Sequence, residues 1–453
     1  MTIHSIVLAQ QKFFQTDTTK DLAFRRDALS KLLTAIEENE SAIFEALKKD
    51  LGKSEMESYM TEVGLVISAI RHAMTSLNKW AKPIRHKTPI THFPAKSYVI
   101  NEPYGVVLIL SPWNYPFFLS ISPLIGAIAA GNCAILKTSR SSSYTSEIIA
   151  SIINNTFSSN YIHVLNMNVD YNEILNCKYD YIFFTGSERV GRIVMRHASE
   201  NLTPVTLELG GKSPCIIDQS ADLKSTAKKI AWGKILNAGQ TCVAPDYVVI
   251  PAELKEEFIS LLQKYFHELL PNALDNDNYG RIINLHHFIR LKNLIGNASS
   301  VIGGKVDEKN FKIEPAIFVD ASFDDPIMKN EIFGPILPVI AYNDLDEILN
   351  IIKQRPKPLA CYIFGKNHAF QEKIISSLSF GGGCINDTIM HVANEHIPFG
   401  GVGSSGMGNY HGKYSFQTFS HQKSIVISGF FDVPVRYQPY TEKKYNFIRS
   451  LLK

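Results

Sequence analysis

Three residues stand in local patterns suited to a nucleophile, a hydrogen-bond donor and a base. Cys242 lies in the run GQTCVAPDY and follows Gly239, which indicates a turn whose backbone approaches another group closely. A thiolate is a strong nucleophile, and amide groups in a turn lower the pKa of a thiol. The competing interpretation is that Cys242 is a small buried hydrophobic residue, the commoner role of a single cysteine.

Glu208 and Asn114 each lie at the end of an apolar run that predicts a buried strand. Glu208 belongs to TLELGGKSP, where partial burial would raise the pKa of the carboxyl group and suit it to general-base catalysis. Its commoner alternative is an acid that points outward. Asn114 belongs to SPWNYP and would donate its side-chain amide to an oxyanion. Its alternative is a turn-forming residue between two prolines.

Other segments have the composition of ligand-binding loops. Residues 185–191 (TGSERVG) lie between a predicted strand and a predicted helix, where backbone amides attract phosphate, although the glycines do not form G-x-G-x-x-G. Lys137 ends another short apolar run and would reach ribose hydroxyls, unless it is a solvated loop lysine. The glycine-rich residues 398–408 form either a flexible loop or a close backbone contact, and their composition favours the loop.

Helices and an α/β pattern are predicted to position these residues. Apolar residues recur at helical spacing in the first hundred positions, and the basic, proline-rich residues 82–97 predict a linker or extended arm. From residue 106, short apolar runs alternate with helical patterns, and a second such series starts near residue 205. Alternation of this kind predicts mostly parallel sheets.

The composition excludes several classes of protein. A chain of 453 residues predicts about three domains. With 45% hydrophobic and 20% charged residues it is neither disordered nor fibrous, and a net charge of +3 argues against nucleic-acid binding. The six cysteines form no CxxC pair, so we expect no metal site, no disulfide scaffold and a reducing, cytoplasmic location. Prolines interrupt the most apolar region, residues 104–136, so we expect no transmembrane segment.

Six motifs taken together resemble those of the aldehyde dehydrogenase superfamily, specifically its class 3 branch of fatty- and aromatic-aldehyde enzymes. In chain order they are SPWN, TGS-x-x-VG, LELGGKSP, GQTCVAPDY, EIFGP and PFGGVGSSGMGNYHGKYSFQTFSH. The likeness extends from about residue 101 to residue 423. It implies NAD(P)-dependent oxidation of an aldehyde to the carboxylic acid through a cysteine hemithioacetal and a thioester.

The resemblance also implies residue roles. Cys242 would be the nucleophile, Asn114 and the Cys242 amide would hold the oxyanion, and Glu208 would activate the hydrolytic water. Glu331 of EIFGP is a second candidate for the base. The cofactor would contact a larger set of residues, namely Trp113, Lys137, Gly186, Ser187, Gly191, Glu331 and Phe333.

One departure from the family pattern concerns the choice of cofactor. The family commonly has Lys-Pro-Ser-Glu where this chain has Lys137-Thr138-Ser139-Arg140. The family glutamate binds the adenosine ribose and repels a 2′-phosphate, whereas a guanidinium can pair with that phosphate. We therefore expect NADP to be accepted at least as well as NAD, unless Arg140 simply points to solvent.

The resemblance implies an α/β architecture with three functional parts. Residues 1–81 and 100–207 would bind NAD(P), 208–391 would form the catalytic domain, 82–99 and 392–430 would form oligomerisation segments, and 431–453 a C-terminal tail. The arm predicts a homodimer.

The substrate class is the least determined part of this prediction. Tyr59, Tyr115 and Phe399, with Ile389 and Met390, would line an apolar tunnel for an aliphatic or aromatic aldehyde, unless they are ordinary core residues. The alternatives to an acid-forming enzyme are a coenzyme A-acylating dehydrogenase, a catalytically silent homologue, and an esterase side activity.

Overall fold

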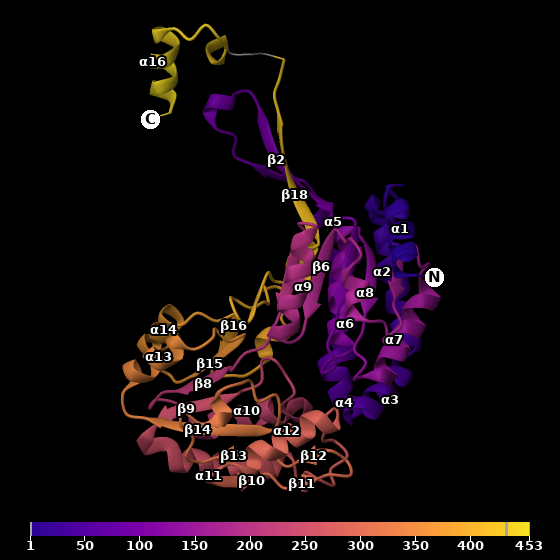
Figure 1. Cartoon of the computed structure of the whole chain (residues 1–453). Helices are drawn as coiled ribbons and strands as arrows, with labels where there is room; N and C mark the ends of the chain where they lie inside the picture. Colours follow the sequence, from indigo (N-terminus) through magenta and orange to yellow (C-terminus); the bar gives the residue numbers. More distant parts are fainter. Residues whose placement is uncertain (1, 431–433, 453) are drawn as a thin grey trace.

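The computed structural model describes residues 2–430 and 434–452, and Figure 1 shows their arrangement. Two α/β units lie side by side, and a slender arm extends away from them. The predicted tail of residues 431–453 falls partly outside the described residues, which leave out 431–433 and 453. In the part of the chain that the structure describes, no helix has the length and apolarity needed to span a bilayer.

The first unit begins with a layer of helices, as the helical spacing predicts. The π-helical turn Tyr59–Val63 joins the last two of them and holds the buried Glu62. The apolar faces of the longer helices are buried in the main core. These helices are α1 (Ile3–Phe14), α2 (Leu22–Glu38), α3 (Glu40–Leu51), α4 (Glu55–Ser58) and α5 (Gly64–Ala81).

A six-stranded sheet forms the centre of this first unit, in the order β17-β7-β6-β3-β4-β5. Its strands run parallel except β17, which pairs antiparallel with β7. The strands are β3 (Val106–Leu110), β4 (Cys133–Lys137), β5 (Ile162–Val164), β6 (Tyr181–Thr185), β7 (Val205–Glu208) and β17 (Gly406–Met407). The helices that connect them are α6 (Phe118–Ala130), α7 (Ser143–Thr156), α8 (Tyr171–Leu175) and α9 (Glu188–Glu200).

The second unit is built on a seven-stranded sheet in the order β10-β13-β14-β9-β8-β15-β16. Only the β10–β13 pair is antiparallel. The strands are β8 (Pro214–Ile217), β9 (Tyr247–Pro251), β10 (Val301–Gly303), β13 (Ala316–Phe318), β14 (Ile336–Tyr342), β15 (Ala360–Phe364) and β16 (Gly382–Ile385). The helices are α10 (Leu223–Ile235), α11 (Lys255–Leu269), α12 (Leu285–Gly296), α13 (Leu345–Gln354) and α14 (His368–Ser377), and a small ribbon pairs β11 (Val306–Asp307) with β12 (Lys312–Ile313).

The basic, proline-rich segment forms an extended arm with a strand from the far end of the chain. β2 (Lys96–Pro103) lies between β1 (Ile84–His86) and β18 (Ser420–Ile427), with both pairs antiparallel. Figure 1 shows this sheet standing off the body, with α16 (Glu442–Leu451) at its outer end. The arm therefore presents two edge strands, β1 and β18, that the described chain does not cover.

Residues 392–430, expected to form an oligomerisation or bridging segment, contribute both to the first unit and to the arm. β17 completes the six-stranded sheet, and α15 (Gly412–Thr418) packs against α6, so only β18 belongs to the arm. The physical reason is that β7 would otherwise be an unpaired edge beside Glu208. Pairing Gly406 with Glu208 satisfies the backbone of that edge.

Candidate active site

The carboxyl ends of three parallel strands bring the predicted site residues of the first unit to one edge. Leu110 pairs with Phe184 in β6, and Thr185 pairs with Glu208 in β7. The loops that follow these strands therefore start at a common level, and they carry Asn114 and Ser187. Ligands of open α/β sheets bind at this edge.

Cys242 is held by a loop with unusual backbone geometry. Asn237, Ala238 and Gly239 have φ values of 51°, 51° and 73°, in the left-handed region. A Cβ on Gly239 would lie 2.3 Å from the Gly334 carbonyl oxygen, so only glycine permits this approach to the EIFGP segment. The close approach predicted from Gly239 is therefore present, and it joins the Cys242 loop to the segment that carries Glu331.

The Asn114 side chain contacts the same loop. Its Nδ2 donates to the Gln240 carbonyl oxygen at 3.0 Å, two residues before Cys242. The residue is 4% exposed, so its amide is fixed in a largely water-free position. This places a preorganised donor beside the cysteine, as an oxyanion site requires.

Glu208 is a buried carboxyl group without a hydrogen-bond partner. It is 2% exposed, and neither carboxylate oxygen has a partner among the described residues. Burial raises the pKa of Glu208 well above its ordinary value. An unsatisfied buried acid of this kind needs an explanation, and activation of a water molecule would supply one.

The glycine-rich residues 398–408 hold the strand of Glu208 and are not a flexible loop. A Cβ on Gly406 would lie 2.1 Å from the Leu207 carbonyl oxygen, and one on Gly401 would lie 2.0 Å from that of Ser405. The Leu209 amide donates to the Ser405 carbonyl at 3.0 Å. The preference for a loop, based on composition, was wrong, because these glycines serve close backbone packing.

The electrostatics at Cys242 differ from those expected from a turn. Desolvation and the carboxyl groups of Glu331 and Glu208 raise the pKa of the thiol, and these effects outweigh the lowering by the backbone amides of Cys242 and Val243. These surroundings therefore favour the protonated form of the side chain. The expected lowering fails because two acids share its weakly polar surroundings.

These raised pKa values predict a pH dependence of the reaction. The nucleophile must lose a proton and a base must be ionised, so kcat/KM should rise with pH from 7 to 9, by up to about tenfold per unit below the pKa of the thiol. Alkylation of Cys242 by iodoacetamide should follow the same trend. A flat profile of both rates between pH 6 and 8 would contradict the neutral thiol.

An apolar cavity of about 200 Å³ opens onto Cys242. Tyr115 and Phe399 line it as predicted, and the Tyr115 hydroxyl lies 2.6 Å from Thr241 Oγ1. Tyr59 is 47% exposed and lies outside the lining, which its neighbours Met60 and Thr61 supply instead. The remaining lining residues are Leu65, Phe118, Leu119, Trp232, Leu236, Val243, Ile389, Met390, Val392, Ala393 and Tyr410.

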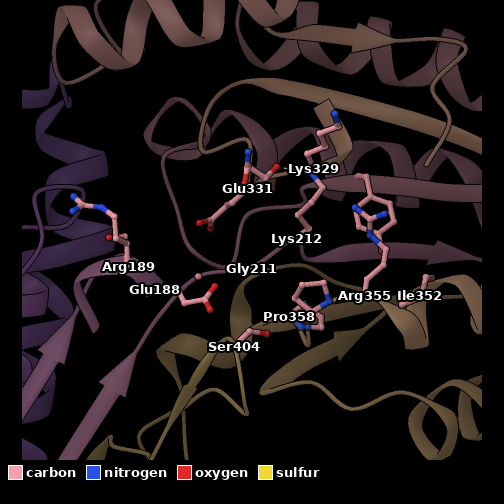
Figure 2. Close-up of a pocket in the computed structure, with 15 residues that line it drawn as sticks. Glu188, Arg189, Gly211, Lys212, Lys329, Glu331, Ile352, Arg355, Pro358 and Ser404 are labelled. Carbon is pink, nitrogen blue, oxygen red and sulfur yellow. Dashed lines mark hydrogen bonds between the residues drawn. The ribbon is translucent and has the colours of Figure 1, made fainter. Parts of the chain in front are cut away.

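A second, more polar cavity of about 330 Å³ lies between the two units (Figure 2). Gly210, Gly211 and Glu331 line it together with Ser187. A Cβ on Gly210 would lie 2.3 Å from Glu331 Oε2, so the glycine makes room for this carboxyl group. Burial, with repulsion from Asp246, raises the pKa of Glu331 to about 8.

This second cavity fits a dinucleotide on several observations. Ser187, at the N-terminus of α9, makes no capping hydrogen bond with its side chain, so the hydroxyl is available to a phosphate. Glu331 Oε1 is buried and has no hydrogen-bond partner among the described residues. Trp113 and Phe333 lie outside the lining of this cavity and form an edge-on pair with ring centres 5.3 Å apart.

Lys137 and Arg140 lie together at the end of β4. Lys137 Nζ donates to the Thr138 carbonyl at 2.8 Å and lies 5.0 Å from the centre of the Tyr171 ring. Burial and the neighbouring Arg140 charge lower the pKa of Lys137 to about 8. Arg140 is exposed, and no carboxylate of the described residues forms an ion pair with it.

Gly186 and Gly191 shape the helix start on the neighbouring strand. A Cβ on Gly186 would lie 2.6 Å from the Phe184 ring, and one on Gly191 would lie 2.9 Å from a Leu209 methyl group. Both glycines therefore permit close packing at the start of α9. Among the predicted cofactor residues, Ser187 and Glu331 line the polar cavity, whereas Lys137 and Arg140 lie outside its lining.

Sequence reasoning missed several residues behind the site. Gln240 anchors the cysteine loop, since its Nε2 donates to the Arg281 carbonyl and its Oε1 accepts from the Ile283 amide, each at 3.0 Å. Lys53 and Glu62 form a fully buried ion pair next to Asn114. No local pattern marked this pair, since Lys53 lies in the polar connection between α3 and α4.

Comparison with known proteins identifies the family. The model of the aldehyde dehydrogenase family matches residues 2–425. The 4,4'-diaponeurosporen-aldehyde dehydrogenase of Staphylococcus aureus is 48% identical over 97% of each chain. A dimeric, NADP-preferring aldehyde dehydrogenase of Rattus norvegicus is 42% identical over 94% of each chain.

Structural similarity agrees with this result. A solved structure of the substrate-bound state of Staphylococcus aureus AldH superposes with a TM-score of 0.97, at 46% identity and with all of both chains covered. The relatives do not support the coenzyme A-acylating alternative. The chain belongs to the aldehyde dehydrogenase family, and it is an oxidoreductase that converts aldehydes to carboxylic acids with NAD or NADP.

Proposed function

We propose that this enzyme oxidises uncharged aliphatic or aromatic aldehydes with Cys242 as the nucleophile. The observation that carries the proposal is the position of Cys242 between two cavities of different character. Its thiol lines the apolar cavity, and Glu331, whose carboxyl group raises the pKa of that thiol, lines the polar one. An aldehyde and a dinucleotide would therefore meet at this sulfur from opposite sides.

The first chemical step is addition of the thiolate to the aldehyde carbonyl. The Cys242 Sγ forms the C–S bond, and the carbonyl oxygen becomes an oxyanion. Asn114 Nδ2 and the Cys242 amide donate hydrogen bonds to that oxygen, in a site already arranged for the charge. The thiol proton leaves to water in the cavity before the attack.

The second half of the reaction releases the acid. A bound nicotinamide ring supplies the hydride acceptor, and Trp113, Phe333 and Glu331 are the residues that would orient it. The thioester left on Cys242 is then hydrolysed. Glu208, once ionised, takes a proton from the attacking water, and the carboxylic acid leaves as the thiol is restored.

The apolar lining predicts how activity depends on the aldehyde. Among straight-chain aldehydes, kcat/KM should rise with each added CH₂ by about fourfold until the cavity of about 200 Å³ is filled, since each buried CH₂ contributes about 0.8 kcal/mol. An aldehyde with a terminal carboxylate should be at least about tenfold poorer than its uncharged analogue. Equal kcat/KM for charged and uncharged aldehydes would contradict the proposed substrate class.

Arg140 supports use of NADP. It lies within electrostatic reach of Lys137 and carries no acidic partner within the described chain, so it is available to a 2′-phosphate. Arg140→Glu should raise the KM for NADP by at least about tenfold and change that for NAD by less than about threefold. Steady-state kinetics with both cofactors checks this, with Arg196→Glu as a control, because Arg196 is exposed and lines neither cavity. A strong NAD preference unchanged in Arg140→Glu would refute it.

The arm supports a homodimer. Its β18 edge carries the exposed Val426 and Ile427, and β16 is an open edge of the seven-stranded sheet, so strand addition between copies would cover both. A monomer in light scattering at assay concentration would contradict this. All six cysteines are free, which supports a reducing cytoplasmic location that cell fractionation would test.

A further inference from the structure

A buried ion pair in the helical layer lies outside the groups that react. Lys53, between α3 and α4, and Glu62, in the π-helical turn, are both 0% exposed, and Lys53 Nζ lies 2.5 Å from Glu62 Oε1. Removing two charges from water is costly, and a buried pair often contributes little net stability. Stability alone is therefore a weak reason for this pair.

The pair holds both ends of the segment that follows β3. Glu62 Oε2 accepts from the Phe117 and Phe118 amides at 2.9 and 3.2 Å, at the start of α6. Lys53 Nζ donates to the Asn114 carbonyl oxygen at 3.4 Å and lies 3.9 Å from the centre of the Tyr115 ring. The two charges thus fix residues 114–118 from one side.

The same segment is tied to the cysteine loop from the other side. The Asn114 backbone carbonyl also accepts a hydrogen bond from the Asn237 side chain, through Nδ2, at 2.7 Å. The backbone N–H of Asn237 donates to Glu57 Oε1, also at 2.7 Å. Asn114 Nδ2 in turn donates to the Gln240 carbonyl. The turn that contains Glu62 also contributes Met60 and Thr61 to the apolar cavity. One hydrogen-bonded unit therefore joins a substrate wall, the oxyanion donor and the nucleophile loop.

We propose that Lys53 and Glu62 are positioning residues that hold the Asn114 amide in its oxyanion-binding orientation. This inference rests on the proposed role of Asn114. Neither residue reaches the cavity, and both act through the backbone of residues 114–118. Loss of either charge would let the Asn114 side chain turn, and loss of Lys53 would also remove its contact with the Tyr115 ring, which lines the apolar cavity.

Kinetics of two variants test the inference. Lys53→Met and the isosteric Glu62→Gln should each lower kcat at least about tenfold, with the aldehyde KM changed less than about threefold. Asn114→Ala should lower kcat by about 10²–10³-fold, as loss of one oxyanion donor does. Rates are normalised to active sites by titration of the Cys242 thiol, so that unfolded protein does not contribute.

A double-mutant cycle separates positioning from a structural role. If the pair acts through Asn114, Lys53→Met/Asn114→Ala should be no more than about threefold slower than Asn114→Ala alone. Multiplied losses in the double variant, or a kcat of the single variants within twofold of the wild type, would overturn the inference. If Lys53→Met does not fold, the same double-mutant cycle is measured with Glu62→Gln in place of Lys53→Met.

Arg25 offers a matched control in the same layer. This buried cation donates to the carbonyls of Thr19, Lys20 and Ala129 at 2.8, 3.0 and 3.1 Å, away from both cavities. Arg25→Met should lower the melting temperature and leave kcat per active site within twofold. Full activity of Asn114→Ala would refute the proposed function, whereas an impaired Asn114→Ala with normal Lys53 and Glu62 variants refutes only the positioning role.

Discussion

Cys242→Ala is expected to abolish aldehyde oxidation, with kcat lowered by at least about 10⁴-fold. Without the sulfur no hemithioacetal forms, so hydride transfer has no covalent intermediate to act on. Reduced-cofactor absorbance, followed with an excess of aldehyde, measures the loss. The melting temperature should change little, because the side chain is only partly buried and lines a cavity at the edge of the core.

The control for this variant is a second cysteine that is also partly exposed. Cys177 lies next to Glu173, whose carbonyl accepts from its Sγ at 3.8 Å, and it lines neither cavity. Cys177→Ala should keep full activity. Aldehyde-dependent reduction of the cofactor by the Cys242→Ala variant would refute the cysteine mechanism.

Glu208→Gln should separate the two halves of the reaction. The amide cannot take a proton from water, so thioester hydrolysis should slow by about 10²–10⁴-fold. The first turnover does not need this base. Rapid mixing should therefore show a burst of about one reduced cofactor per active site, followed by a slow steady state. Acid quench and mass measurement should find the acyl group on Cys242.

Glu331→Gln is the matched comparison for the base. Glu331 lines the polar cavity, so its replacement should slow the burst itself while hydrolysis stays fast. The opposite pattern, with a retained burst in Glu331→Gln and normal turnover in Glu208→Gln, would exchange the two roles. The experiment thus decides an assignment that the motifs left open.

Local patterns predicted much of the framework. Val106–Leu110 and Tyr181–Thr185 are short apolar runs, and both are strands buried along their whole length. Motif order and the rule that ligands lie at strand carboxyl ends were sufficient to bring Asn114, Ser187 and Glu208 to one edge. Helix α14 was missed although Asn367 is an ordinary N-cap, whose Oδ1 accepts from the Ala369 amide at 3.0 Å.

Properties that depend on distant segments were not predictable in this way. The pKa of Cys242 reflects two acids, Glu208 and Glu331, on separate segments. Lys53 and Glu62 are nine residues apart in the sequence. The reason for burying them becomes clear only from the fold, which places the start of α6 beside Glu62. The prediction that Tyr59 lines the cavity identified the correct turn. Which side chains of this turn face the cavity depends on its π-helical winding.

The antiparallel pairing of β17 with β7 also has a consequence for the order of folding. The ribosome makes Glu208 well before its partner strand, because Gly406 and Met407 follow only after the whole second unit up to β16. In the same way, β2 is made long before β18, with which it pairs. Both β7 and β2 therefore keep an open edge while the intervening chain is made. The growing chain carries its helical layer before the active-site edge is complete, until β17 and β18 emerge.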